Sequence, residues 1–400
     1  MTSAIYNYPS RLSYLIFMGI ALTIGGLGFL FSNAGFATAA FEVLFVYFCV
    51  TSLLVEKRIS RKVGFFIVAS TAYLVYGYTY SVVINKDNVL DFLMAFKAYY
   101  YVILLCLITK KSLFKPNQIK KIFYALSLMF LAKYTLSRLI QGDARPTVYT
   151  ENNFELILLI CLYYLKSIKC NTRNYKELFL LLLIVLISGS RSSVLALVIV
   201  AASMHITKLN MKLVINSVIL IFISAVAVFL FMSRMGGGGI ESIDRYKFLL
   251  LFLGELQNMP WWRVFIGEPP ITPLSPFTCY QLAYYESLFS QNQDGSCYSV
   301  IFHSYIMRSI FDHGLIGLSF LLVFVHKALR TSSYTMRQAL TVNSIFLITG
   351  LSVSSFNNVY VALSLLFFLA SFQKTKLTKS NVINRNPAIS AGNYQTQNIQ

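Results

Sequence analysis

His303 is the residue in this chain best placed for acid–base chemistry. It lies in FHSYIMRSIFDHGLIGL (302–318), where a long polar segment gives way to an apolar run. The unperturbed pKa of histidine lies near neutral pH, so this side chain can take a proton from a hydroxyl group as its oxygen attacks. A lone histidine is as often a packed structural residue, but the junction of a loop and a helix combines rigid support with access to water. We therefore predict that His303 is a general base.

Three arginines at breaks in the apolar pattern are candidates for binding an anion. Arg191 lies in SGSRSS between two apolar runs, Arg245 in ESIDRYKF, and Arg145 in QGDARPTVY. An arginine at membrane depth is costly and usually faces a polar cavity or a partner. A guanidinium can grip a phosphate through two hydrogen bonds, and at Arg191 an adjoining helix start would add backbone N–H donors. We predict a phosphate or diphosphate site, with Arg145 as a secondary contact; the alternative is arginines that only anchor the chain at the membrane surface.

The sequence offers little for metal or nucleotide chemistry. No Asp-x-Asp pair occurs, His303 has no companion at metal-ligand spacing, and no Walker or Rossmann glycine pattern is present. We therefore expect no metal and no cofactor. The spacing of the carboxylates along the chain also allows a glycosidase that uses two of them. The candidates on the outer side are Asp87, Asp91, Asp143, Glu151, Asp244 and Glu286.

The elements that must position these residues are membrane-spanning helices. The chain is 56% hydrophobic and only 12% charged, with a mean hydropathy of +0.64. An apolar stretch of roughly 20 residues is enough to cross a bilayer, and about twelve occur. The composition predicts an all-α polytopic fold with spans near 12–31, 36–55, 63–84, 88–108, 121–140, 150–167, 176–189, 191–206, 212–233, 304–326, 338–353 and 356–373.

The net charge of +19 is distributed in a way that indicates topology rather than nucleic-acid binding. Most of the 34 basic residues fall in alternate loops and in the C-terminal tail. Cytoplasmic loops of membrane proteins carry this excess of lysine and arginine, so both termini are expected in the cytoplasm. The alternation then places segments 138–150, 188–193 and 234–303 on the outer side. Arg145, Arg191, Arg245 and His303 would therefore share one side of the membrane.

The segment 234–303 is the largest part of the chain outside the predicted spans. Trp261 and Trp262 follow an apolar run at 246–256 and are typical of an anchor at the membrane surface. The glycine run 236–239 suggests a hinge. Cys279 and Cys297 could form a disulfide outside the cytoplasm, although spacing alone does not decide it. The predicted organisation is spans 1–9 in 1–233, a large periplasmic loop in 234–303, spans 10–12 in 304–373 and a cytoplasmic tail in 374–400.

Three motifs, in order, resemble those of the O-antigen polymerase and O-antigen ligase superfamily of bacterial envelope glycosyltransferases. SGSRSS is similar to the family's Ser-Arg break between two spans. The Arg245 segment runs into WWRVFIGEPP, similar to an arginine followed by a "…p…GxG" element, with Pro269 in place of the second glycine. HSYIMRSIFDHGLIGL is close to "HNxYLxxLxExGLIGL", with Ser304 in place of asparagine. The resemblance covers roughly 145–320.

The resemblance implies an inverting, metal-independent transfer from an undecaprenyl-diphosphate-linked glycan within a glycosyltransferase-C-like body. Arg191 and Arg245 would hold the diphosphate and His303 would activate the acceptor hydroxyl. Expected partners are the lipid-linked donor and acceptor, membrane lipid and a chain-length regulator, at the periplasmic face of the bacterial inner membrane. We expect a polymerase of O-antigen, capsule or exopolysaccharide repeat units. A ligase to lipid A-core shares the motifs, and a lipid-linked oligosaccharide flippase is the alternative from another class.

Overall fold

The computed structural model describes residues 8–30, 34–172, 174–205 and 244–372, and they are almost entirely helical. Helices make up most of the described residues, which contain no strand. The longer α-helices are α2 (Tyr8–Leu30), α3 (Ala34–Val55), α4 (Arg61–Tyr78), α6 (Lys97–Ile108), α7 (Pro116–Leu136), α8 (Asn152–Cys170), α9 (Tyr175–Ser188), α10 (Arg191–His205), α12 (Asp244–Asn258), α15 (Tyr305–Thr331), α16 (Met336–Gly350) and α17 (Val359–Leu369).

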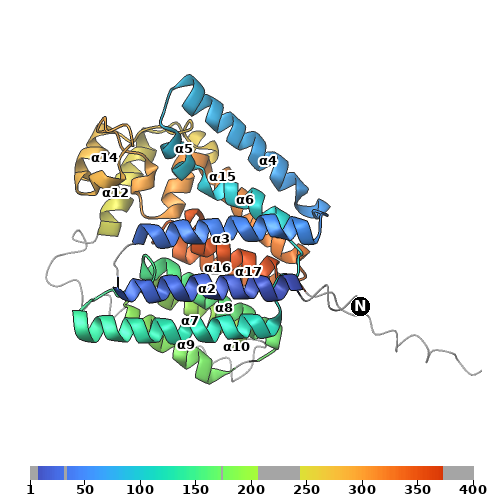
Figure 1. The fold of residues 1–400 in the computed structure, drawn as a ribbon. Coiled ribbons are helices and arrows are strands. Elements are labelled where there is room, and N and C mark those ends of the chain that lie inside the picture. The colour runs from blue at the N-terminus through green and yellow to red at the C-terminus, as the bar shows by residue number, and fades with distance from the viewer. Residues whose placement is uncertain (1–7, 31–33, 173, 206–243, 373–400) are drawn as a thin grey trace, which may run out of the picture.

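Most of these helices run side by side as a bundle, with α2, α3 and α7 in front in Figure 1. Helix α17 lies at the centre, because every residue from Val359 to Leu369 is buried. Helix α4, which continues as a π-helix (Thr79–Ile84), runs obliquely to α2, α3 and α7 (Figure 1) and packs against α6 and α15. The bundle thus has a buried helix at its centre and an apolar outer surface that includes Val43, Leu54 and Phe65, each at least 70% exposed.

The apolar helices indicate a membrane protein. Four of the described helices are long and apolar enough to cross a bilayer, and five qualify if one bent pair counts as a single span. The four lie at Ser10–Gly28, Phe36–Leu54, Arg61–Ile84 and Tyr305–Thr331. The predicted all-helical membrane fold is confirmed at this level. The predicted ninth span (212–233), the glycine run 236–239 and the tail 374–400 lie outside the described residues.

The predicted fourth span, 88–108, is not one straight helix. It consists of α5 (Val89–Ala95) and α6, bent by 61° at Phe96. A break of this kind frees one backbone donor and one acceptor, which must be satisfied inside the protein. The side chain of Asn357 does both, since its Oδ1 accepts from the N–H of Ala98 at 2.9 Å and its Nδ2 donates to the carbonyl of Met94 at 3.1 Å. The amide of Asn357 therefore holds the bend.

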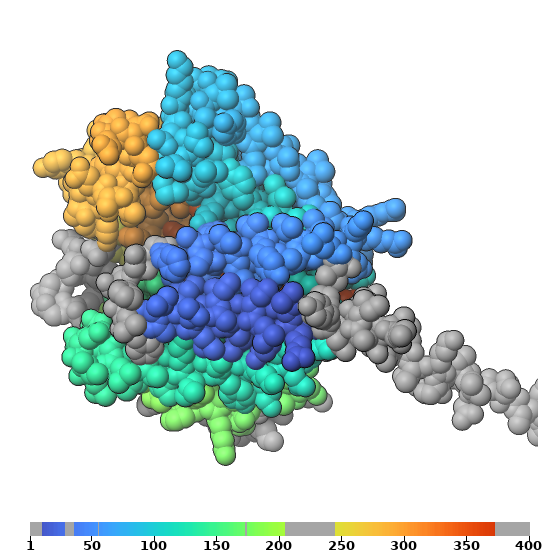
Figure 2. Space-filling model, viewed as in Figure 1, coloured from blue at the N-terminus to red at the C-terminus, as the bar shows by residue number. Residues whose placement is uncertain are grey.

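The described part of the large loop, 244–303, folds into a small lobe at one end of the bundle. Helix α12 is followed by α13 (Arg263–Ile266) and α14 (Pro276–Gln281), and they enclose a separate apolar core that includes Phe248, Leu282 and Phe302. Cys279 and Cys297 are joined by a disulfide inside this core, which decides the question that spacing left open. Figure 2 shows the lobe, in orange, against the end of the bundle that carries α5. This part of the loop is therefore a folded unit.

Two glycines allow the lobe to dock on α15. Gly267 has φ +88° and Gly314 has φ +66°, a region that favours glycine. A Cβ on Gly314 would lie 2.2 Å from the carbonyl oxygen of Phe265, and one on Gly267 would lie 2.6 Å from that of Asp312. The N–H of Glu268 donates to the carbonyl of Phe311 at 2.8 Å in the same contact. The GEPP and DHGLIGL motifs are thus the two sides of one backbone contact.

We expect Gly314→Ala to destabilise the protein strongly. The added methyl would meet backbone, and the residue would also be held at an unfavourable φ, so the loss should reach at least about 3 kcal/mol. Thermal unfolding of the purified protein in detergent measures it. Gly254→Ala in α12 is the matched control, because nothing lies within 4 Å of its Cβ position. An equal melting temperature for the wild type and Gly314→Ala would contradict the tight contact.

Candidate active site

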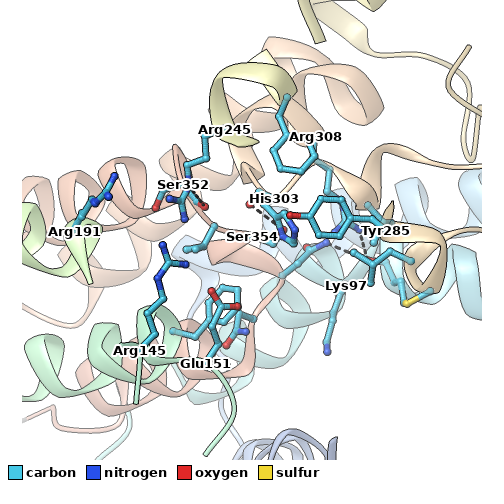
Figure 3. A pocket seen from close by; sticks show the side chains of 18 residues that line it. Lys97, Arg145, Glu151, Arg191, Arg245, Tyr285, His303, Arg308, Ser352 and Ser354 are labelled. Carbon is cyan, nitrogen blue, oxygen red and sulfur yellow. Dashed lines mark hydrogen bonds between the residues drawn. The ribbon is translucent and has the colours of Figure 1, made fainter. Parts of the chain in front are cut away.

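A cavity of about 600 Å³ opens between the lobe and the bundle. All four residues that the sequence singled out, Arg145, Arg191, Arg245 and His303, line it. They come from a loop, the start of α10, the start of α12 and the end of the lobe, so the cavity joins segments that are distant in the chain. In Figure 3 the three arginines lie on one side of the cavity and His303 with Tyr285 on the other. The guanidinium groups of Arg145 and Arg245 point toward one another.

The position of Arg191 depends on the break between α9 and α10. Gly189, at φ +69°, ends α9, and Ser190 is anchored through its hydroxyl to Oδ1 of Asn153 at 2.7 Å. The neighbouring Asn152 donates from Nδ2 to the carbonyl of Ser188 at 2.8 Å. The serines of SGSRSS thus tie the break to the first turn of α8. Arg191 is the first residue of α10, so its side chain stands at a helix N-terminus, as predicted.

Arg145 lies in a loop that one buried carboxylate organises. The Glu155 carboxylate accepts hydrogen bonds from the backbone N–H groups of Val148 and Tyr149, each at 2.7 Å. It also accepts from the hydroxyl of Tyr134 at 2.7 Å, and Glu155 itself is fully buried. A carboxylate bound by several donors fixes the backbone around it. Glu155 therefore holds the segment that carries Arg145, and sequence reasoning did not identify this role.

Arg245 comes from the first turn of α12, at the start of the apolar run 246–256. Its Nε donates to the carbonyl of Ser352 at 3.3 Å, so the side chain reaches from the lobe to the turn that follows α16. That turn also lines the cavity with Ser354 and Asn357. Arg245 therefore spans the boundary between lobe and bundle at the cavity.

His303 lies at the junction of the lobe and α15, with its ring between two aromatic rings. The ring centroids of Phe248 and Tyr285 are 5.3 Å and 5.0 Å from that of His303, both in edge-to-face geometry. The next residue, Ser304, is the N-cap of α15, since its hydroxyl accepts from the N–H of Met307. Serine at the position where the family motif has asparagine thus keeps a capping function. The imidazole is held by packing at the cavity wall.

The cavity carries more positive charge than the sequence analysis assigned to it. Lys97 and Arg308 also line it, and each forms an ion pair, Lys97 with Glu42 and Arg308 with Asp312. Arg308 is only 4% exposed and donates to the carbonyl of Met94 at the bend in α5–α6. A buried arginine in an apolar run signals a polar cavity, so HSYIMRSIFD contained a usable clue to Arg308.

The balance of charge around the cavity suits an anionic ligand. The lining cations are Lys97, Arg145, Arg191, Arg245 and Arg308, and the lining carboxylate is Glu151. Arginine forks match phosphate oxygens, and in a partly enclosed site the attraction is weakly screened. Among the described residues no group of three or more His, Cys, Asp or Glu side chains could hold a metal ion. The arrangement can bind a phosphate or diphosphate directly through arginine.

Removing the disulfide should weaken the lobe that carries Arg245 and His303. Cys279 and Cys297 close a loop with a sequence separation of 18, for which a loss of about 3 kcal/mol is expected. Changing both to serine should therefore make residues 244–303 sensitive to limited proteolysis at a lower temperature than in the wild type. Cys170→Ser, at a free and partly exposed cysteine, is the control and should change nothing. Identical cleavage of all three proteins would contradict the prediction.

Comparisons with known proteins identify no family for this chain. A scan against family models, a search of curated proteins and a search of solved structures each returned no match. The residues of the cavity and the resemblance of the three motifs are therefore what indicates a function.

Proposed function

We propose that this protein is a glycosyltransferase that polymerises undecaprenyl-diphosphate-linked repeat units. The observation that supports it best is the placement of three arginines and one histidine on opposite sides of one cavity (Figure 3). An inverting transfer needs the base and the leaving-group site on different sides of the donor sugar, because the acceptor oxygen attacks the sugar carbon from the face opposite to the leaving group.

The reaction is a single displacement. A sugar hydroxyl of the acceptor loses its proton to His303 as its oxygen bonds to the anomeric carbon of the donor. The bond between that carbon and the diphosphate oxygen breaks, and the electron pair leaves with the lipid diphosphate. Arg191 and Arg245 stabilise the charge that develops there, with Arg145 as a further contact. The proton on His303 then passes to water, and no metal enters the step.

The proposal includes a cellular setting. The protein would lie in the bacterial inner membrane, with about twelve spans in a glycosyltransferase-C-like body. Both termini would be cytoplasmic and the cavity periplasmic, as the distribution of basic loops suggests. A chain-length regulator is a partner consistent with polymerisation.

The glycan profile of a strain lacking this gene tests the proposal. A polymerase mutant should export single repeat units and lose the ladder of longer chains, and the wild-type gene should restore the ladder. If long lipid-linked chains accumulate while lipid A-core stays uncapped, the protein is a ligase. If single lipid-linked units accumulate where only cytoplasmic probes reach them, it is a flippase.

A further inference from the structure

A second cavity, of about 810 Å³, lies between α4 and α15 at the end of α15 remote from His303. Its apolar lining includes Phe65 and Phe66 from α4 and Ile316, Phe320 and Val323 from α15. The two cavities share no lining residue, and the lysine at the mouth of the second, Lys327, lies roughly 20 Å along α15 from Gly314. The cavity, which we call the α4–α15 groove, is therefore separate from the candidate active site.

The mouth of the groove is cationic. Lys62, Lys327 and Arg330 line it, and none of its lining residues is acidic. Arg330 donates one hydrogen bond, to the carbonyl of Tyr334 at 2.8 Å, and a guanidinium has five donors, so capacity for a phosphate remains. Three cations at one end of an apolar groove complement a ligand with an anionic head and a hydrocarbon tail.

The apolar part of the groove has the length of an acyl chain in one leaflet. Ile316, Val323 and Lys327 recur at helical spacing along α15, and from Ile316 to Lys327 the helix rises about 16 Å. Half the hydrocarbon core of a bilayer is about 15 Å thick. Ile316 is 61% exposed, Val323 49% and Phe65 70%, whereas Phe66 forms the floor at 6%. A chain in the groove would cover the exposed side chains.

We propose that the α4–α15 groove binds an anionic phospholipid, with its phosphate at Lys62, Lys327 and Arg330 and an acyl chain against Phe65, Ile316 and Val323. This site does not depend on the proposed transferase activity. If these cations only fixed the orientation of the chain in the membrane, they would not need an apolar groove beside them or a groove as long as an acyl chain. The lipid would fill the groove that residues of α4 and α15 line.

Native mass spectrometry of the purified full-length protein tests the proposal, with phosphatidylglycerol and phosphatidylcholine of identical acyl chains as probes. The wild type should retain one phosphatidylglycerol at least about tenfold better than phosphatidylcholine. Changing Lys62, Lys327 and Arg330 together to alanine should remove this preference. Changing Arg11, Lys120 and Lys121, three exposed cations on α2 and α7, should leave it within about twofold of the wild type.

Equal retention of the two lipids by the wild type would overturn the proposed site. An equal loss of the preference for phosphatidylglycerol in both triple variants would also overturn it. Photo-crosslinking with a phosphatidylglycerol that carries its reactive group in the acyl chain locates the lipid even if the first variant fails to fold. Adducts should concentrate on peptides that contain Phe65, Ile316 or Val323, and an even spread over the outer helices would also overturn it. Displacement of the lipid by undecaprenyl phosphate would assign the groove to the polyprenyl chain instead.

Discussion

Replacing His303 with alanine should abolish chain elongation while leaving the protein in the membrane. Loss of a general base typically costs 10²–10⁴-fold in rate, and in cells that loss should reduce a ladder of long chains to single repeat units. The ring of His303 lies edge-to-face against Phe248 and Tyr285 at the cavity wall, and the amount of the variant in the membrane reports whether the fold survives its removal. Glycan gels from a complemented deletion strain provide the measurement.

His326→Ala is the matched control for this prediction. His326 lies on the same helix, α15, but near the end remote from the cavity, and it should be replaceable with full elongation. Protein amounts in the membrane must be equal in the two variants for the comparison to hold. Long chains at the wild-type level in His303→Ala would rule out His303 as the base.

Arg191→Ala and Arg245→Ala should each reduce transfer by about 10²–10³-fold, as expected for the loss of a donor that stabilises developing charge. Lysine at either position should restore only part of the rate, because an ammonium cannot form the two parallel bonds of a guanidinium. The loss should appear mainly in kcat, since the leaving group gains its charge during the reaction. Arg145→Ala should have a smaller effect. Kinetics with purified protein and lipid-linked repeat units measure all three.

Arg337→Ala controls for a general effect of lost positive charge. Arg337 is exposed on α16 and contacts the carbonyl of Ala202, outside the cavity. Its removal should leave the kinetic constants unchanged. A uniform rise in KM at unchanged kcat for Arg191→Ala and Arg245→Ala would mean that these arginines only bind substrate, contrary to the proposed role.

Local sequence patterns predicted the parts of the site that depend on local structure. SGSRSS predicted a break before Arg191, and a break is present because Gly189 ends α9 there. The polar-to-apolar junction predicted His303 at the start of a helix, and α15 begins at Tyr305. These residues were identified by position and charge, while their meeting in one cavity required the structure.

Contacts between distant residues explain what local patterns missed. Asn357 holds the bend in α5–α6 across a sequence separation of 259, and no local signal marks such a pair. In the sequence Glu155 is one charge at the start of an apolar run, and only the structure shows that it accepts three backbone N–H donors from the Arg145 loop. The loop 234–303 was predicted as a mostly polar segment with a membrane-surface anchor, whereas apolar residues spread over its described part, 244–303, form a small core that contains the disulfide.

The most direct test is transfer by the purified protein between synthetic undecaprenyl-diphosphate-linked repeat units in the presence of a metal chelator. We expect chains of two or more repeats, release of undecaprenyl diphosphate in step with each bond formed, and an inverted configuration at the new linkage. His303→Ala should yield none of these products. Three results would contradict the proposed mechanism: activity that requires a divalent metal, retention of configuration at the new linkage, or no chain formation by the wild-type protein.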